Sequence, residues 1–177
     1  MSTLKVNSII PVAGVPTGGG GGIVQIKQTV KTDKVSFGTS SFSDLSGMSV
    51  SITPTSTSHK VFIMSHMTLC HNDQHHTVIF RLVRGSTAIC VGDQVGSNRR
   101  RATGAFAQVG NGDHPFTVSF QFMDSPSTTS EVTYKIQVQT EGGDQASLNG
   151  RQNGDTDATE AKNARYASTI TAMEVSA

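Results

Sequence analysis

The stretch VFIMSHMTLC, residues 61–70, decides the fold, because both of its alternating sets of side chains are largely apolar. Successive side chains of a strand point to opposite faces of a sheet, so this stretch divides into two faces. The first face carries Val61, Ile63, Ser65, Met67 and Leu69. The second face carries Phe62, Met64, His66 and Cys70. Other parts of the chain are therefore expected to cover both faces of this stretch. This predicts a long strand in the centre of a β-sheet.

Two further stretches alternate more cleanly and predict strands with one face toward a core and the other toward solvent. In the first, Phe116, Val118, Phe120 and Phe122 alternate with Thr117, Ser119 and Gln121. In the second, Val132, Tyr134, Ile136 and Val138 alternate with Thr133, Lys135, Gln137 and Gln139. Additional strands are expected at residues 23–30, 48–52, 77–83, 87–91, 102–109 and 167–175.

The gaps between these stretches are rich in residues that favour turns, such as Asn111-Gly112-Asp113 and the stretch 142–154. No segment repeats apolar residues with the helical period, so very little helix is expected. A chain of 177 residues has room for one domain with its own core. The sequence therefore predicts an all-β fold, a single jelly-roll-like β-sandwich over residues 23–177.

A run of glycines separates the N-terminal part of the chain from the predicted sandwich. Residues 1–17 form an extended segment whose apolar positions are Leu4, Val6, Ile9 and Ile10. Gly18, Gly19, Gly20, Gly21 and Gly22 follow, and such a run is costly to order, so residues 18–22 predict a hinge. A phosphate-binding loop is excluded because the GK[ST] signature is missing. Since a glycine hinge transmits little rigidity, residues 1–17 are expected to anchor the chain to another protein.

Composition excludes several classes of partner. Lys and Arg number 14 against 13 acidic residues, and a net charge of +1 gives no basis for binding nucleic acid. Prolines and glycines interrupt the N-terminal apolar residues, and no apolar stretch reaches the roughly 18 residues of a membrane helix, so neither a signal peptide nor membrane insertion is expected. Cys70 and Cys90 lie in strand-like runs, where free buried cysteines are favoured over a disulfide.

Four of the six histidines lie between His66 and His76. His71, Asp73 and His75 could supply three metal ligands from one loop. A polar turn with solvated or pH-sensitive histidines is the favoured alternative, so no metal or other cofactor is expected.

The run Arg99, Arg100 and Arg101 precedes a predicted strand. No aromatic residue interleaves with the arginines and the chain has no Trp, which argues against stacking on nucleic-acid bases. Ion pairs with a neighbouring subunit, or with acids such as Asp93, are favoured, because the planar guanidinium group suits such interfaces.

Motifs for catalysis are missing. The sequence contains no G-x-S-x-G turn and no evident Ser, His and Asp trio. Asp155, Asp157 and Glu160 lie in a stretch rich in Gly, Asn and Gln, which is typical of a surface loop rather than of paired glycosidase carboxylates. We expect a protein that is not an enzyme.

Several segments together resemble small tail-fibre or virion-surface proteins of cyanophages and related marine tailed phages. They are MSTLKVNSI (1–9), VQIKQTVKT (24–32), LSGMSVSITP (45–54), FRLVRGS (80–86) and ASTITAMEV (167–175). The resemblance covers nearly the whole chain, and it rests on strand patterns and turn residues. It implies a fibre or spike subunit, usually a trimer, whose N-terminus docks into the virion.

Three functions follow as expectations. The first is a short tail fibre or spike, a homotrimer bound to a tail adaptor or capsid protein, which presents the sandwich to a host cell-surface glycan. The second is a capsid decoration protein whose sandwich forms a surface knob. The third and least favoured is a tail enzyme that degrades polysaccharide. In each case the protein is made in the host cytoplasm and ends in the virion.

Overall fold

The fold is built almost entirely from strands. The computed structural model describes residues 22–73, 76–107, 114–154 and 163–176. The strands are β1 (Ile23–Lys31), β2 (Val35–Phe37), β3 (Ser43–Ile52), β4 (Lys60–His71), β5 (Thr77–Arg84), β6 (Thr87–Ile89), β7 (Gly104–Ala107), β8 (Phe116–Asp124), β9 (Val132–Thr140), β10 (Ala146–Leu148) and β11 (Ser168–Val175). One short 3-10 helix, η1 (Glu141–Gly143), follows β9. Across the described ranges, no helix is long and apolar enough to cross a membrane.

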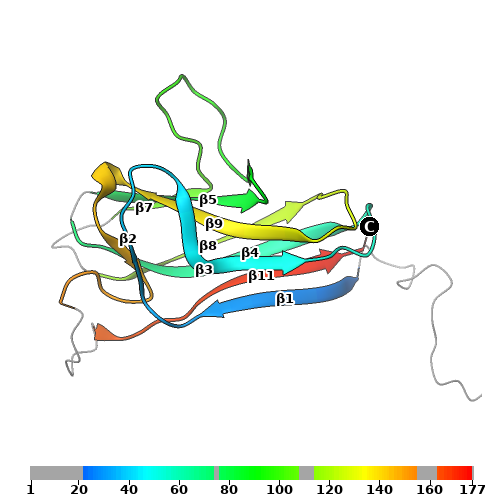
Figure 1. Cartoon of the computed structure of the whole chain (residues 1–177), viewed down its shortest axis with the longest axis horizontal. Coiled ribbons are helices and arrows are strands. Elements are labelled where there is room, and N and C mark those ends of the chain that lie inside the picture. Colours follow the sequence, from blue (N-terminus) through cyan, green and yellow to red (C-terminus); the bar gives the residue numbers. More distant parts are fainter. Residues whose placement is uncertain (1–21, 74–75, 108–113, 155–162, 177) are drawn as a thin grey trace, which may run out of the picture.

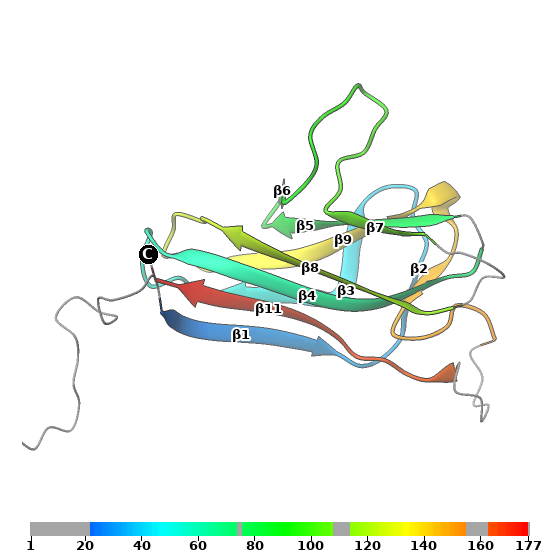
Figure 2. The ribbon, with the colours of Figure 1, turned by 180° about the vertical axis from the view of Figure 1, so that it is seen from behind.

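The strands form two antiparallel sheets that lie along the long axis of the molecule (Figures 1 and 2). Sheet A has the order β1-β11-β4-β8, and the short strands β10 and β2 extend it beside one end of β4. Sheet B has the order β3-β9-β5-β7, and β6 lies beside the other end of β5. The first and last strands are therefore neighbours, and successive strands mostly change sheet. This is the strand order of a jelly roll, so the predicted jelly-roll sandwich is confirmed.

The core lies between the inner faces of the two sheets. Its large buried side chains include Met48, Ile52, Ile63, Met67, Leu69, Leu82, Tyr134, Ile136, Leu148 and Ile170. On β9 the predicted alternation is confirmed from Val132 to Val138, because the apolar side chains are buried while Thr133, Lys135 and Gln137 are partly exposed. Gln139, which was predicted to face solvent, is buried. Burial of this apolar surface contributes about 25 cal/mol per Å² and is the main force that holds the sheets together.

The Tyr134 hydroxyl has a hydrogen-bond partner inside this core. The Tyr134 hydroxyl donates a hydrogen bond of 2.7 Å to Oδ2 of the buried Asp124. Arg84 Nη1 donates to both carboxylate oxygens of Asp124 at 2.9 Å. Burial, followed by the bond to Asp124, raises the pKa of Tyr134 above its usual range. The cluster joins β5, β8 and β9, so it fixes sheet B against the end of β8.

Strand β4 is central in sheet A, as predicted, with β11 and β10 on one edge and β8 on the other. The predicted cover on both of its faces is wrong for the outer face, where Met64 is 40% exposed and His66 is exposed. The phenylalanine row of β8 packs against the core, but Phe120 and Phe122 are only half-buried and Phe116 is exposed. The reason is position, because β8 lies at the edge of sheet A.

Two short strands, β2 and β10, were not predicted from the sequence. Strand β10 lies inside the stretch 142–154, for which turns were expected, and pairs with β4 on one side and β2 on the other. Its three side chains are all buried, so it offers no polar and apolar alternation to detect. Strand β6 ends earlier than predicted, just before Cys90, whose backbone φ of 53° is incompatible with an extended strand.

The described chain begins and ends at the same end of the sandwich. The Gly22 N–H donates to Ser176 Oγ at 3.0 Å, and the Ser176 N–H donates to the Gly22 carbonyl, also at 3.0 Å. The other predicted hinge residues, Gly18 to Gly21, lie outside the described residues, so the hinge stays a prediction. Neither cysteine forms a disulfide within the described residues: Cys70 is buried and Cys90 is partly buried.

Candidate functional surfaces

The outer face of sheet A is apolar at its margins and uncharged over most of its area. The register of β1, β11, β4 and β8 places one row of side chains from each strand on this face. Its members are Ile26, Gln28, Val30, Thr169, Thr171, Met173, Phe62, Met64, His66, Ser119, Gln121 and Met123. Among these side chains only His66 is ionisable. We call this set the A face.

Strand β1 turns its apolar side outward. Ile26 and Val30 lie on the A face and are each 54% exposed. The alternate side chains point toward sheet B, where the Thr29 hydroxyl donates to the Ser49 carbonyl at 2.6 Å. An edge strand of a sandwich normally points its apolar residues inward. The apolar side of β1 is therefore available to something other than the core of this chain.

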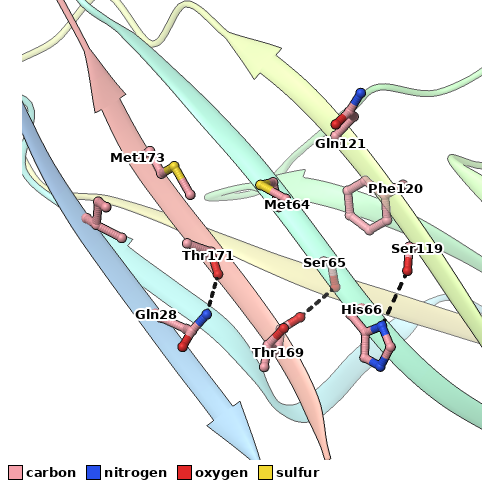
Figure 3. A pocket seen from close by; sticks show the side chains of 11 residues that line it. Gln28, Met64, Ser65, His66, Ser119, Phe120, Gln121, Thr169, Thr171 and Met173 are labelled. Atoms are coloured by element: carbon pink, nitrogen blue, oxygen red, sulfur yellow. Dashed lines mark hydrogen bonds between the residues drawn. The ribbon is translucent and has the colours of Figure 1, made fainter. Parts of the chain in front are cut away.

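A groove of about 730 Å³ runs along the A face, between the side chains that Figure 3 shows. Met64 and Met173 form the apolar part of the groove. A row of polar side chains crosses the groove. In that row Gln28 Nε2 donates to Thr171 Oγ1 at 2.8 Å, and Ser65 Oγ donates to the Thr169 carbonyl at 3.0 Å. These bonds hold the polar side chains of the groove in place.

A buried carboxylate lies at the end of the sandwich where β1 begins. Glu174 is fully buried, and its oxygens accept hydrogen bonds from Gln25 Nε2 at 2.6 Å and from the Thr55 N–H and hydroxyl at 2.6 and 2.7 Å. His59 Nδ1 lies 2.7 Å from Oε1 of the same carboxylate. Burial alone would raise the pKa of Glu174, but these hydrogen bonds outweigh it and lower the pKa to about 2. The network ties β1, β11 and the 53–59 loop together.

The histidine region is arranged differently from the prediction. His71 and Asp73 are close, since His71 Nδ1 lies 3.0 Å from the Asp73 backbone nitrogen. His75 lies outside the described residues. In its place, His76 and Asp144 approach His71, and one ligand atom of each lies within 4.8 Å of the others. Burial lowers the pKa of His71, which keeps its ring neutral. No sequence spacing connects Asp144 to the histidines, because it follows β9 and η1 along the chain.

The three arginines lie in the 90–103 loop that projects from sheet B (Figure 1). Arg100 Nη2 donates to the Ser40 carbonyl at 3.3 Å, and Arg101 Nε donates to the Gly92 carbonyl at 2.7 Å. Within the described residues, Arg99 to Arg101 form no ion pair with Asp93. Arg100 and Arg101 instead line a pocket of about 330 Å³ together with Arg81 of β5. Their role at a subunit interface stays a prediction.

The predicted anchoring residues Leu4, Val6, Ile9 and Ile10 lie outside the described residues, so attachment through them remains an expectation. Gly22 is the one residue of the predicted N-terminal parts that the structure describes, and it is bound to Ser176. The outward apolar side of β1 was not recognised from the sequence. Alternation alone shows that a strand has two faces, and it does not show which of them meets the core.

Comparisons with known proteins give no family. No protein-family model matches the chain, and no curated protein matches it. Among solved structures, the structure of the infectious bursal disease virus Gx strain is 12% identical, with a TM-score of 0.41 over 86% of this chain and 38% of that chain. The crystal structure of the infectious bursal disease virus VP2 subviral particle is 11% identical, with a TM-score of 0.39 over 86% of this chain and 40% of that chain. This chain thus spans about two fifths of the chains to which it is similar.

Proposed function

We propose that this chain is a structural protein of a phage virion, a short tail fibre or spike subunit that assembles as a homotrimer through its A face. The single observation that carries the proposal is the outward apolar side of β1, where Ile26 and Val30 are not covered by any described part of the chain. A jelly roll is a fold that viruses use to build particles, and such a subunit buries sheet faces and edges against its copies.

A second copy of this chain is the occupant that best fits the A face. Apart from His66, the side chains of the A face are not ionisable, and the exposed Lys60 continues the same row of β4 at its end. The centre of the face therefore carries little charge that would repel a second copy. The face extends to β1 and β8, the strands at the edges of the four-strand series of sheet A. Unpaired edges favour association with other strands, and an oligomer covers them. The N-terminal segment then remains available to dock into the virion.

The oligomeric state of the full-length protein tests the proposal. Size-exclusion chromatography with light scattering at micromolar concentration is expected to give a trimer. Ile26→Glu places a charge in the contact and is expected to give a monomer with an unchanged circular dichroism spectrum. Val95→Glu is the matched control, because Val95 is a comparably exposed aliphatic residue in the projecting loop, and it is expected to stay trimeric. A monomeric wild type, or a trimeric Ile26→Glu variant, contradicts assembly through this face.

Copy number in purified virions distinguishes a fibre from a decoration protein. Quantitative mass spectrometry against the major capsid protein is expected to give a small number of trimers per particle. Hundreds of copies, or labelling spread over the shell in immunogold micrographs, would establish capsid decoration instead. Deletion of residues 1–17 is expected to abolish incorporation into particles while the truncated protein still folds.

A further inference from the structure

Three side chains from distant parts of the sequence meet at one end of the sandwich. His71 ends β4, His76 stands just before β5, and Asp144 follows η1. They are brought together by pairing of β10 with β4, in which Ala146 lies opposite His71. One ligand atom from each of the three lies within 4.8 Å of the other two. This separation is small enough for the three atoms to share one metal ion after minor side-chain rotation.

His71 offers an unsatisfied nitrogen at this point. The side chain is fully buried, and its Nε2 has no hydrogen-bond partner among the described residues. Its Nδ1 lies 3.1 Å from the Asp73 carbonyl oxygen and 3.0 Å from the Asp73 backbone nitrogen, so it can donate to the carbonyl or accept from the N–H. Metal binding selects the tautomer in which Nδ1 donates to the carbonyl and the lone pair on Nε2 is free. A buried polar atom without a partner costs about 1 to 3 kcal/mol. A ring nitrogen held by a backbone carbonyl, with the other nitrogen open, is the usual arrangement of a metal-binding histidine.

His76 and Asp144 supply the remaining donors. His76 Nδ1 lies 2.5 Å from Asp144 Oδ2, and the two rings of His71 and His76 meet edge to face with centroids 5.7 Å apart. The Asp73 carboxylate is also near, with Oδ2 3.8 Å from His76 Nδ1. Two imidazoles and a carboxylate form a donor set that suits Zn²⁺ and similar ions, whereas Ca²⁺ and Mg²⁺ prefer oxygen donors alone.

We propose that His71, His76 and Asp144 bind a divalent transition-metal ion of the Zn²⁺ class. The ion ties the connection between β4 and β5 to the segment before β10, so it acts as a structural clamp at this end of the sandwich. The Asp73 carboxylate or a water molecule completes the coordination shell. The site is independent of assembly through the A face, and either proposal can fail without the other.

Metal binding by the tag-free, full-length protein tests the site. After removal of metal with EDTA, isothermal titration with ZnCl₂ is expected to give one ion per chain, and Zn²⁺ is expected to raise the thermal midpoint while Mg²⁺ does not. Replacement of Zn²⁺ by Co²⁺ is expected to give the visible absorption of a site with low coordination number. Less than one Zn²⁺ per chain at micromolar affinity would overturn the proposal.

Single substitutions locate the ligands. His76→Ala and Asp144→Asn alter partly exposed side chains, so both variants are expected to fold, and each should weaken Zn²⁺ binding by at least about tenfold. His66→Ala is the matched control, because it removes an exposed histidine of β4 that lies on the A face, and its Zn²⁺ affinity should not change. Full retention of binding in both His76→Ala and Asp144→Asn would place the ion elsewhere and refute this assignment.

Discussion

The two faces of sheet A differ although the same strands build both. On β4, Ile63 and Met67 point inward and are fully buried, while Met64 between them points outward and is 40% exposed. On β4 itself the residue types of the two faces are similar, so there the difference in burial comes from what covers each face. Sheet B covers the inner face, and nothing in the described part of the chain covers the outer one. The apolar side chains of β4 therefore belong to two surfaces, one that is buried in the core and one that the described part of the chain leaves exposed.

The outer face of sheet B shows what a solvent face of this protein looks like. There the Asp44 carboxylate accepts hydrogen bonds of 2.7 Å from Lys135 Nζ and from Gln137 Nε2. Arg81 donates to Gln137 Oε1 at 2.9 and 2.7 Å and stacks over the Phe42 ring at 4.1 Å. Charged and amide groups satisfy one another on this face. Among the described side chains of the A face, the hydrogen bonds instead join Gln28 to Thr171 and Ser119 to His66, and no ion pair forms there. The two outer faces therefore differ in charge.

The largest expected difference in stability is between substitutions of Ile63 and Met64, two neighbouring residues on opposite faces of β4. Ile63→Ala leaves a cavity in a fully buried site and should lower the free energy of unfolding by about 4 kcal/mol. Met64→Ala should change it by less than about 0.5 kcal/mol in the monomer, because that side chain is exposed. Urea unfolding of both variants, made in the monomeric Ile26→Glu background, measures the difference. Similar losses for the two would remove the distinction between the faces.

A smaller effect is expected from Glu174, a buried carboxylate on the inner side of sheet A. The pKa of Glu174 is lowered to about 2 from an ordinary value of 4.5, so its charge stabilises the fold above pH 4.5. That contribution is lost as the pH falls from 4.5 toward 2. Glu174→Gln should therefore cost about 2 to 3 kcal/mol at pH 7 and progressively less as the solution is acidified.

Chemical denaturation at pH 7, 4.5 and 3 measures this change. Gln25, Thr55 and His59 are the groups that face the carboxylate, and all three remain in the variant. Glu131→Gln, at an exposed position, is the control and should keep the wild-type pH dependence. A wild type whose stability is flat between pH 5 and 3 would show that the Glu174 network contributes nothing.

The smallest effect is expected on the outer face of sheet B. Asp44→Asn removes the charge that Lys135 pairs with, and an exposed pair of this kind contributes only about 0.5 kcal/mol. The loss should disappear in 1 M NaCl, where the Debye length is about 3 Å. A loss above about 2 kcal/mol, or one that salt does not change, would show that this face is not an ordinary solvent surface.

The sequence predicts most of this fold because its long strands alternate in their side chains. The alternation of side chains over residues 61–70 and 132–139 predicts β4 and β9. The turn residues between the many short strands predict a β-sandwich. Strand β10 is not predictable in this way, since all three of its side chains are buried. The cluster of His71, His76 and Asp144 depends on that strand, because the register of β10 with β4 brings Asp144 close to His71. Local patterns carry no information on such long-range pairing.

The pairing of β1 with β11 also has a consequence for how the protein is made. Ile26 lies opposite Met173, and nearly the whole sandwich separates them in the sequence. At a ribosome speed of about 5 to 20 residues per second, β1 waits on the order of ten seconds for its partner. Such non-local closure is slow in folding, and during the wait the apolar side of β1 is open to chaperones and to neighbouring nascent chains. Polysomes translating this message therefore hold β1 in an unpaired form, and if subunits assemble through the A face as proposed, assembly can begin before synthesis ends.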